Sequence, residues 1–355
     1  MARVLLIGLG DLGRRLALGL AAAPEVGELV LAGRREEDGR AFAALAAACG
    51  RARVRFVYAD AAQEAELEAL LRKEQPQLVV QAASGASPWA APGSDAPAAQ
   101  ALLAAGFAAQ LPAHLPLVRH VMRAVRASGL AVPVVNAAFP DFTHSILAAE
   151  GLAPTVGIGN AGMIRARVVA ELRRRGEEEL EPRLKVLAHH AHLTPVVLAQ
   201  PLPEGCTQPR IYIGEDGQRR DELAFSGPPL PSRRELNALP AASGLPILRA
   251  LLGGPELRTS APGPGGLPGG YPVRVSAAGV ELDLPAVIDL EEALAYQWES
   301  ARVDGVERLD ADGTVHFTAA ARRALEPFAP ALTEPLAPGE AEGRLGLLRQ
   351  LLGSA

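Results

Sequence analysis

Short apolar runs alternate with alanine-rich amphipathic stretches through the first half of this 355-residue chain. The apolar runs predict six strands, at residues 3–8, 28–33, 54–60, 77–84, 132–138 and 155–160. Continuous apolar strands joined by helical crossovers are typical of a parallel sheet with helices on both faces. The pattern therefore predicts an α/β fold in which residues 1–158 form a doubly wound parallel sheet.

The pattern changes after about residue 180. Strands of a different sheet are predicted in 183–198 and 209–216, a helix over 231–252, an ordered loop at 259–272 that is rich in glycine and proline, and a hairpin around the DADG turn at 310–313. These elements predict that residues 159–355 form a second α+β domain, which we expect to bind substrate and to take part in oligomerisation.

A glycine motif follows the first predicted strand. Gly8, Gly10 and Gly13 fit G-x-G-x-x-G, with a strand directly before them and a helix directly after. Such a turn brings a pyrophosphate close to the backbone and offers it the free N–H groups of the helix start, here at Asp11 and Leu12. In this context the motif predicts a dinucleotide-binding Rossmann fold.

The second predicted strand ends in Arg34 and Arg35, where an acidic residue would bind the ribose 2′-hydroxyl of NAD. An arginine at this place can pair with the 2′-phosphate of NADP. We therefore predict NADP as the cofactor, with NAD as the alternative. Asp60, at the end of the third strand, is a candidate for contact with the adenine or for capping the next turn.

Composition limits the other function classes. The net charge is −5 and the pI is near 5.9, which does not favour a nucleic-acid partner. Two distant cysteines exclude a disulfide scaffold, and no apolar run reaches the ~18 residues of a membrane span. We expect a cytoplasmic protein that binds a small molecule, with no membrane or nucleic-acid partner.

Residues 115–200 resemble the lactate/malate dehydrogenase superfamily. The resemblance lies in a helix, LVRHVMRAVRASG, then a strand with its asparagine and a Pro-Asp turn, VPVVNAAFPDFTHSILAAEGL, and then TVGIGN. The run KVLAHHAHLTPVV stands where that family has its catalytic histidine. The resemblance implies an NAD(P)-dependent dehydrogenase for a small polar substrate of the hydroxy-acid or keto-acid type, and a homodimer.

The resemblance also implies roles for single residues. Asn136 would lie beside the nicotinamide and the substrate, His190 would donate and accept the proton, and Arg167 roughly matches the substrate-binding arginine. The sequence departs from the family near Ile164 and Arg165, where the aspartate that orients the histidine is missing. The loop at 84–97 also has no arginine to polarise a substrate carbonyl.

Two alternatives follow from these departures. The opening region also resembles the NADP-binding half of saccharopine-type and opine-type reductases, which reduce imines and need no aspartate–histidine pair. A protein that binds NADP(H) as a sensor and has lost catalysis would also lack these residues.

Other polar residues remain open candidates. On a strand, His190 and His192 would face one side and His189 the other; because no third ligand has a supporting spacing, we predict no metal site. His144 is a second acid/base candidate, or a residue of a helix N-terminus. Ser84, after the fourth strand, is a candidate for contact with the nicotinamide ribose or the substrate, or for a turn.

Overall fold

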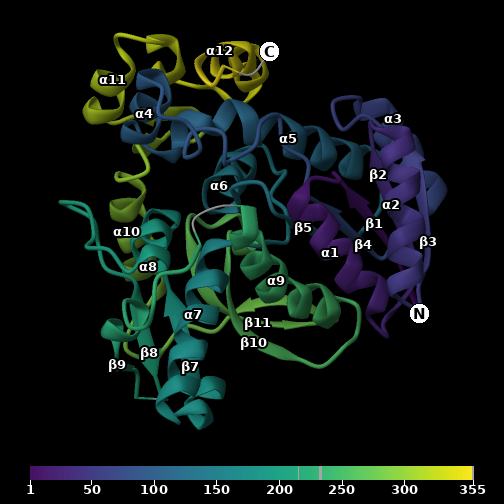
Figure 1. Ribbon diagram of the computed structural model, residues 1–355, viewed down its shortest axis with the longest axis horizontal. Helices are drawn as coiled ribbons and strands as arrows, with labels where there is room; N and C mark the ends of the chain where they lie inside the picture. The colour runs from purple at the N-terminus through teal and green to yellow at the C-terminus, as the bar shows by residue number, and fades with distance from the viewer. Residues whose placement is uncertain (215, 232–233, 354–355) are drawn as a thin grey trace.

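The computed structural model describes residues 1–214, 216–231 and 234–353, and confirms all six predicted strands (Figure 1). They form one parallel sheet in the order β3-β2-β1-β4-β5-β6. The strands are β1 (Ala2–Ile7), β2 (Val26–Gly33), β3 (Arg53–Tyr58), β4 (Leu78–Gln81), β5 (Val134–Asn136) and β6 (Val156–Gly157).

The two faces of β1 show why this sheet is buried on both sides. Val4 and Leu6 pack in a core with the helices on one face, whereas Leu5 and Ile7 pack in a core on the other. Successive strand residues point to opposite faces, so an uninterrupted apolar strand needs a helical layer on each. The helices of this part are α1 (Asp11–Ala22), α2 (Glu36–Cys49), α3 (Glu64–Glu74), α4 (Pro97–Ala104), α5 (Leu111–Ser128) and α6 (Pro140–Ala149).

The strand order reverses between β1 and β4, because β1 pairs with β2 on one side and with β4 on the other. In open α/β sheets the ligand lies beyond the carboxyl ends of the strands at such a point. The glycine motif after β1 and the asparagine at the end of β5 therefore lie along the edge at which a ligand is expected.

Two small antiparallel sheets follow the parallel one (Figure 1). Helices α7, α8 and α9 accompany them, and α9 packs on α1. The sheets contain β7 (Leu184–Leu187), β8 (Arg210–Ile213) and β9 (Gln218–Arg219), and β10 (Leu257–Pro262), β11 (Gly270–Ser276) and β12 (Gly279–Leu282). The helices are α7 (Asn160–Arg175), α8 (Leu193–Leu198) and α9 (Ala238–Leu251). Parts of the strand predicted at 209–216 and of the helix predicted at 231–252 lie outside the described residues.

Two sequence predictions are wrong in this region. The histidine run is not a strand: β7 ends at Leu187 and His190–His192 form a short 3₁₀ helix, so the expected alternation of its side chains does not apply. Both ends of the predicted loop at 259–272 are strand, since β10 and β11 pair from Leu257–Val275 to Pro262–Gly270. Only the connection between them is irregular, and it packs against α6.

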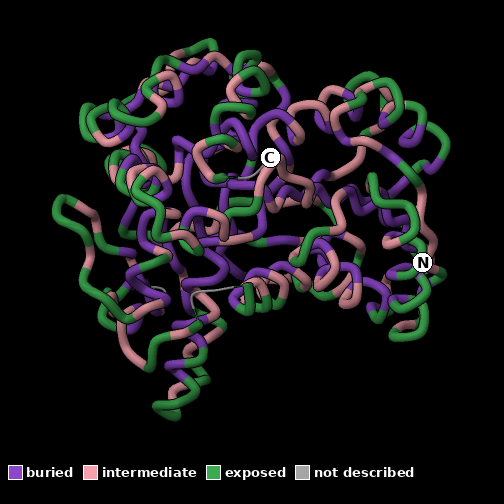
Figure 2. The backbone as a smooth tube through the Cα atoms, turned by 45° about the horizontal axis from the view of Figure 1, so that its top comes forward, coloured by how far each residue is buried: buried purple, intermediate pink, exposed green. Residues whose placement is uncertain are grey.

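The C-terminal segment returns to the parallel-sheet part of the molecule. Helix α12 packs on α5, α11 packs on α4, and their buried residues share a core with Leu5 and Ile7 of β1. Figure 2 colours the chain by the burial of each residue, with buried residues in purple and exposed residues in green. The elements are α10 (Leu290–Ala301), β13 (Val306–Leu309), β14 (Val315–Phe317), α11 (Ala319–Leu325) and α12 (Ala341–Leu351). The predicted DADG hairpin is confirmed, while the division into 1–158 and 159–355 stays a prediction.

None of the described helices is by itself both long and apolar enough to cross a bilayer. One bent pair, Pro97–Ala104 with Phe107–Ser128, meets the length and composition criteria only when its two parts are taken together.

Adjacent leucines on α12 test whether this helix belongs to the core. Leu348 is fully buried, whereas Leu347 is 39% exposed. We expect Leu348→Ala to lower the free energy of unfolding by about 2–5 kcal/mol, since it leaves a cavity in the core. Leu347→Ala, the matched control, should change it by no more than about 0.5 kcal/mol. Urea denaturation of both variants measures this, and equal effects would contradict the assignment of α12 to the core.

Candidate active site

The glycine turn after β1 has the shape that a dinucleotide requires. Gly8 has a φ of +101°, and a side chain there would collide with the backbone of Ala83. A side chain on Gly13 would collide with the carbonyl oxygen of Gly8, so α1 can pack this closely only with glycine. A side chain on Gly10 would meet no atom within 4 Å, which leaves open space beside the turn.

Helix α1 begins at this open space. Gly10 is its N-cap and provides no side-chain hydrogen bond, so the N–H groups of Asp11 and Leu12 stay available. Unpaired N–H groups and the helix dipole together favour a bound phosphate. The turn therefore fits the pyrophosphate of a dinucleotide at the expected glycines.

A hollow of about 470 Å³ lies at the end of β2, where the adenosine ribose of a dinucleotide would come. Arg35 lines it, and the exposed Arg34 precedes it in the chain. Asp38 also lines it and accepts a hydrogen bond from Arg14, at 2.5 Å, while Arg35 lies 3.4 Å away. The hydrogen bond from Arg14 lowers the pKa of Asp38, so this carboxylate is ionised and already paired.

Two other residues that are candidates for contact with the cofactor, Asp60 and Ser84, make local hydrogen bonds. Asp60 accepts from the N–H of Ala62 at 3.0 Å, which is the turn-capping alternative. The hydroxyl of Ser84 donates to the carbonyl of Ala86 at 2.9 Å, again within a turn. Contact of either residue with a cofactor stays a prediction.

His190 and Asp304 form the central pair of the candidate site. Nδ1 of His190 lies 2.9 and 3.0 Å from the two carboxylate oxygens of Asp304, which comes from the turn between α10 and β13. Burial raises the pKa of Asp304, but the charge of His190, the hydrogen bond from His190 and the neighbouring His189 outweigh this effect and leave the pKa well below its usual range. An ionised carboxylate only accepts hydrogen bonds, so Nδ1 of His190 carries a hydrogen.

This pair leaves the other ring nitrogen free. Among the described residues, none hydrogen-bonds to Nε2 of His190, and this atom is not buried. Burial lowers the pKa of His190, but the charge and hydrogen bond of Asp304 and the charge of Asp141 overcome it, so that the pKa lies above its ordinary value. An oriented imidazole with one accessible nitrogen can give or take a proton near neutral pH.

A second carboxylate lies behind the pair. Asp141, in the first turn of α6, is fully buried and accepts a hydrogen bond from Asn160 at 2.5 Å. Burial raises its pKa, against the lowering effect of the charges of His189 and His190. Nδ1 of His189 lies 3.2 Å from Asp304, so one carboxylate contacts both neighbouring histidines.

His144 has a structural role. Its Nδ1 donates to the carbonyl of Gly263 at 2.7 Å, and its Nε2 accepts from Asn136 at 3.1 Å. Burial lowers the pKa of His144 to about 4, so the ring is neutral. Both nitrogens are engaged, and the ring joins β5 to the connection between β10 and β11 rather than acting as a free acid or base.

The carboxamide of Asn136 is engaged as well. Its oxygen accepts from the N–H of Ala138 at 2.9 Å, and its nitrogen donates to the carbonyl of Ala138, to the hydroxyl of Thr143 and to His144. Asn136 is fully buried at the end of β5, the position expected for it. A contact of its side chain with nicotinamide or substrate stays a prediction, since these bonds already fix the group.

Arg167 is committed to the protein backbone. Its guanidinium donates to the carbonyls of Ala224, Gly227 and Pro228 at 2.9–3.2 Å, and only 5% of the residue is exposed. These bonds hold the segment after β9 against α7. A role in binding substrate stays a prediction, and the observed contacts give Arg167 an anchoring role.

His192 is also structural. Its Nδ1 accepts from the N–H of His189, and its Nε2 lies 2.9 Å from the hydroxyl of Thr207. Burial lowers its pKa to about 3. In the part of the chain that the structure describes, no three His, Cys, Asp or Glu side chains are arranged to hold a metal ion.

Two aromatic rings pack against the imidazole of His190. The ring of Phe107 lies 4.3 Å from the imidazole and that of Phe139 lies 5.2 Å from it, between centroids. Phe139 follows β5, so the imidazole lies at the carboxyl edge of the parallel sheet. His114, on α5, stacks on Phe107 at 5.3 Å.

The second part of the molecule also touches the glycine turn. Asn237 donates to the carboxylate of Asp11 at 2.9 Å, and Trp89 donates to the oxygen of Asn237 at 3.3 Å. The loop after β4 and the start of α9 therefore meet beside the turn that would hold the pyrophosphate.

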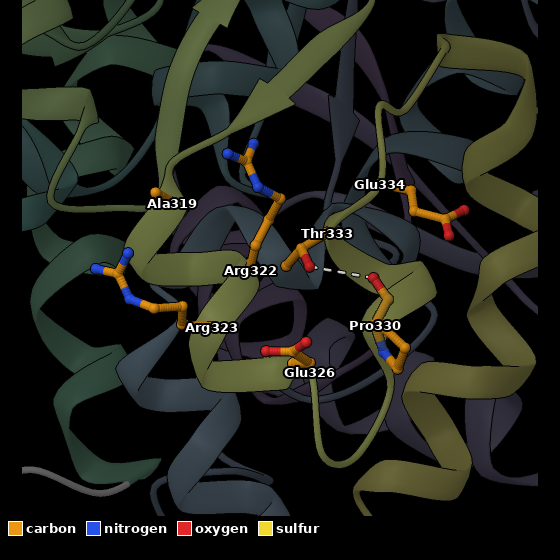
Figure 3. Close-up of a pocket in the computed structure, with 7 residues that line it drawn as sticks. All are labelled: Ala319, Arg322, Arg323, Glu326, Pro330, Thr333 and Glu334. Carbon is orange, nitrogen blue, oxygen red and sulfur yellow. Dashed lines mark hydrogen bonds between the residues drawn. The ribbon is translucent and has the colours of Figure 1, made fainter.

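Another hollow, of about 430 Å³, lies at α11 and the segment that follows it (Figure 3). Arg322, Arg323, Glu326 and Glu334 contribute charges of both signs to it. It contains no residue of the glycine turn and none that contacts His190, so we do not assign it to the candidate site.

Sequence reasoning missed Asp304, Asp141 and the aromatic residues. Asp304 stands in a short turn, ARVDGVERL, without a motif. Only its position after α10 brings it to His190, 114 residues away in the chain. The Pro-Asp turn that contains Asp141 was visible in the sequence, but nothing local indicated that its carboxylate is buried.

Comparisons with known proteins support the fold. No protein-family model matches the chain, and no curated protein matches its sequence. Among solved structures, malate dehydrogenase from Archaeoglobus fulgidus in complex with NADH has a TM-score of 0.56 at 14% identity, over 85% of this chain and 97% of that one. Minor L-lactate dehydrogenase from Enterococcus mundtii has a TM-score of 0.52 at 16% identity, over 87% and 99%.

A lactate dehydrogenase from a deep-sea metagenome library of the Medee basin is similar in the same way, with a TM-score of 0.52 at 13% identity. It covers 85% of this chain and 96% of its own. The expected lactate/malate dehydrogenase-like fold, a Rossmann sheet followed by a second α+β part, is therefore confirmed. The likeness to saccharopine-type reductases stays a prediction.

The His190–Asp304 pair has a measurable titration. We expect Asp304→Asn to lower the pKa of His190 below its value in the unchanged protein, because burial then acts without the carboxylate. NMR chemical shifts of the His190 ring, followed against pH, measure both midpoints. Asp312→Asn, in the exposed hairpin turn, is the control and should leave the midpoint unchanged. Equal midpoints in the Asp304→Asn variant and the unchanged protein would contradict the pairing.

The same shift has a consequence for stability. Because the pKa of His190 is raised on folding, the pair stabilises the folded protein fully below the unfolded pKa of about 6.5. This contribution is lost as the pH rises through the folded-state pKa.

Proposed function

We propose that the protein is an NADP-dependent oxidoreductase that interconverts a hydroxyl and a carbonyl group on a small polar substrate, as in hydroxy and keto acids. The observation that carries the proposal is the His190–Asp304 pair at the carboxyl edge of a sheet that also has the dinucleotide turn. Proton transfer and dinucleotide binding are then combined in one crevice.

The glycine turn and the start of α1 would hold the pyrophosphate, with Gly10 giving the open approach. Arg34 and Arg35 support NADP over NAD, because their guanidinium groups can pair with a 2′-phosphate. The bound nicotinamide would supply or take up the hydride, that is, one hydrogen and two electrons.

His190 would balance that transfer with a proton. In reduction, Nε2–H gives its proton to the substrate oxygen as the carbonyl becomes a hydroxyl; in oxidation, Nε2 takes it back. Asp304 orients the ring through Nδ1 and stabilises its protonated form. The aspartate that the sequence lacks near Ile164 is thus replaced by one from the C-terminal segment.

The Asp304 pair favours this reaction over the two alternatives. An imine reductase does not need an aspartate–histidine pair, and a sensor without catalysis has no use for a free Nε2 on an oriented ring. The aspartate missing near Arg165 was one argument for the alternatives, and Asp304 supplies a carboxylate in its place. A homodimer and a cytoplasmic location remain part of the proposal.

Cofactor choice is tested by titration calorimetry. We expect NADPH to bind at least about tenfold more tightly than NADH, which corresponds to about 1.4 kcal/mol. Arg34→Ala should remove most of that difference by weakening NADPH alone. Arg40→Ala is the control, since Arg40 is exposed on α2 and paired with Glu36. Equal affinities of the unchanged protein for both nucleotides would remove the 2′-phosphate argument.

The role of His190 is tested by kinetics. We expect His190→Asn to keep the affinity for NADPH while turnover falls by about 10²-fold or more, because general acid/base catalysis is lost. His316→Asn, on the β13–β14 hairpin, is the control and should keep normal turnover. Near-normal turnover by the His190→Asn variant would exclude His190 as the acid/base and favour imine reduction or sensing.

A further inference from the structure

Aromatic rings pack against the imidazole of His190. Phe107 and Phe139 flank the imidazole, and His114 extends the wall as it stacks on Phe107 with an angle of 24° between the rings. Phe139 has a backbone φ of +48°, a left-handed conformation that residues other than glycine rarely adopt. The fold keeps this unfavourable backbone at the residue that turns its ring toward His190, which points to a function for the ring.

His114 contributes no charge to this wall. Only 3% of it is exposed, and neither of its ring nitrogens has a hydrogen-bond partner among the described residues. Burial lowers its pKa to about 4, and the charge of His190 acts in the same direction. A neutral ring with two unpaired nitrogens can bind an uncharged polar group, and it offers no positive charge to an anion.

The charges close to His190 are negative. Asp304 and Asp141 are the charged groups that act on it. Within residues 1–214, 216–231 and 234–353, no arginine or lysine is hydrogen-bonded to or paired with these two carboxylates. Arg167 is the candidate for binding a substrate carboxylate. Its guanidinium group donates hydrogen bonds to three backbone carbonyls instead.

A substrate carboxylate beside His190 would lose water and lie near Asp304 and Asp141, and among the described residues the charges that act on His190 include no arginine or lysine. Burying an unpaired charge beside a like charge is unfavourable, whereas an apolar or aromatic substituent gains contact with the rings. The charge distribution and the aromatic wall of Phe107, Phe139 and His114 thus both favour an uncharged substrate with an apolar or aromatic substituent.

We propose that the substrate is an uncharged carbonyl compound and its alcohol: a ketone, or the ester or amide of a keto acid, with an apolar or aromatic substituent against Phe107 and Phe139. The inference rests on the proposed oxidoreductase function and narrows its substrate class. The free carboxylate of the corresponding keto acid is the disfavoured form.

Matched substrates test the inference in the complete protein. Phenylpyruvate is compared with its ethyl ester and its amide, each with NADPH, by the fall in nicotinamide absorbance. We expect kcat/KM to be at least about tenfold higher for the ester and the amide, mainly through a lower KM. An equal or higher kcat/KM for phenylpyruvate overturns the inference.

A binding measurement separates failure of the inference from failure of the proposed function. Phenylacetamide and phenylacetate are titrated into the protein saturated with NADP⁺, and the ring signals of His190 are followed by NMR. Tighter binding of phenylacetamide supports the inference even if none of the three carbonyl compounds is reduced, an outcome that would count against the oxidoreductase alone. Tighter binding of phenylacetate, or no binding of either compound by a protein that binds NADP⁺, overturns the inference.

A positive charge introduced at Phe107 should reverse the preference for phenylacetamide over phenylacetate. We expect Phe107→Arg to bind phenylacetate more tightly than phenylacetamide, because the new guanidinium pairs with the carboxylate. Phe328→Arg is the matched control: Phe328 is 46% exposed on the surface, and the preference should stay unchanged. If Phe107→Arg folds and binds NADP⁺ but keeps the original preference, the ring does not face the substrate and the inference fails. If it does not fold, the two measurements on the unchanged protein decide.

Discussion

The hydrogen bond between His190 and Asp304 joins the end of β7 to the turn between α10 and β13. It fixes which nitrogen of the imidazole carries a hydrogen, and so leaves Nε2 for chemistry. The same carboxylate contacts His189, so the two neighbouring histidines share one negative charge. The electrostatics of the crevice depend on that buried carboxylate staying ionised, which the two imidazoles bring about.

The other polar groups near this pair are of two kinds. Some are hydrogen-bonded within the protein and stabilise the fold, and others are free to contact a ligand. His144, His192 and Arg167 each have their ring nitrogens or guanidinium donors engaged, and they connect segments that are distant in the chain. His114 is different, since its nitrogens are buried and lack partners among the described residues. A buried polar group without a hydrogen-bond partner destabilises the folded protein. The ring nitrogens of His114 therefore indicate a place at which a polar group of a ligand can bind.

The aromatic rings beside His190 are the basis on which we propose a substrate class different from the one that the resemblance implies. The similarity to lactate and malate dehydrogenase structures, at 13–16% identity, is a similarity of fold. Proteins with a similar fold can have different charged residues around the substrate. Here the expected arginine anchors a loop and phenylalanines stand beside the imidazole, so the fold and the substrate class are separate questions.

Local chemistry in the sequence determined much of this protein. Continuous apolar runs, alanine-rich crossovers and three glycines were enough to predict six parallel strands, their helices and the dinucleotide turn, because strand burial and tight turns depend on neighbouring residues. His190 was named as the acid/base through the resemblance of its segment to the lactate/malate dehydrogenase superfamily. The strand expected across the histidine run was wrong, since a short apolar stretch does not reveal where β7 gives way to a helical turn.

Only the tertiary structure decided which groups surround His190. Asp304 lies 114 residues further along the chain, and a C-terminal segment that returns over α4 and α5 brings it there. Phe107, Phe139 and Asp141 reach the same place from other elements. Burial and pairing, which set the pKa of each group and the use of each donor, are properties of this three-dimensional arrangement, and no local pattern in the sequence encodes them.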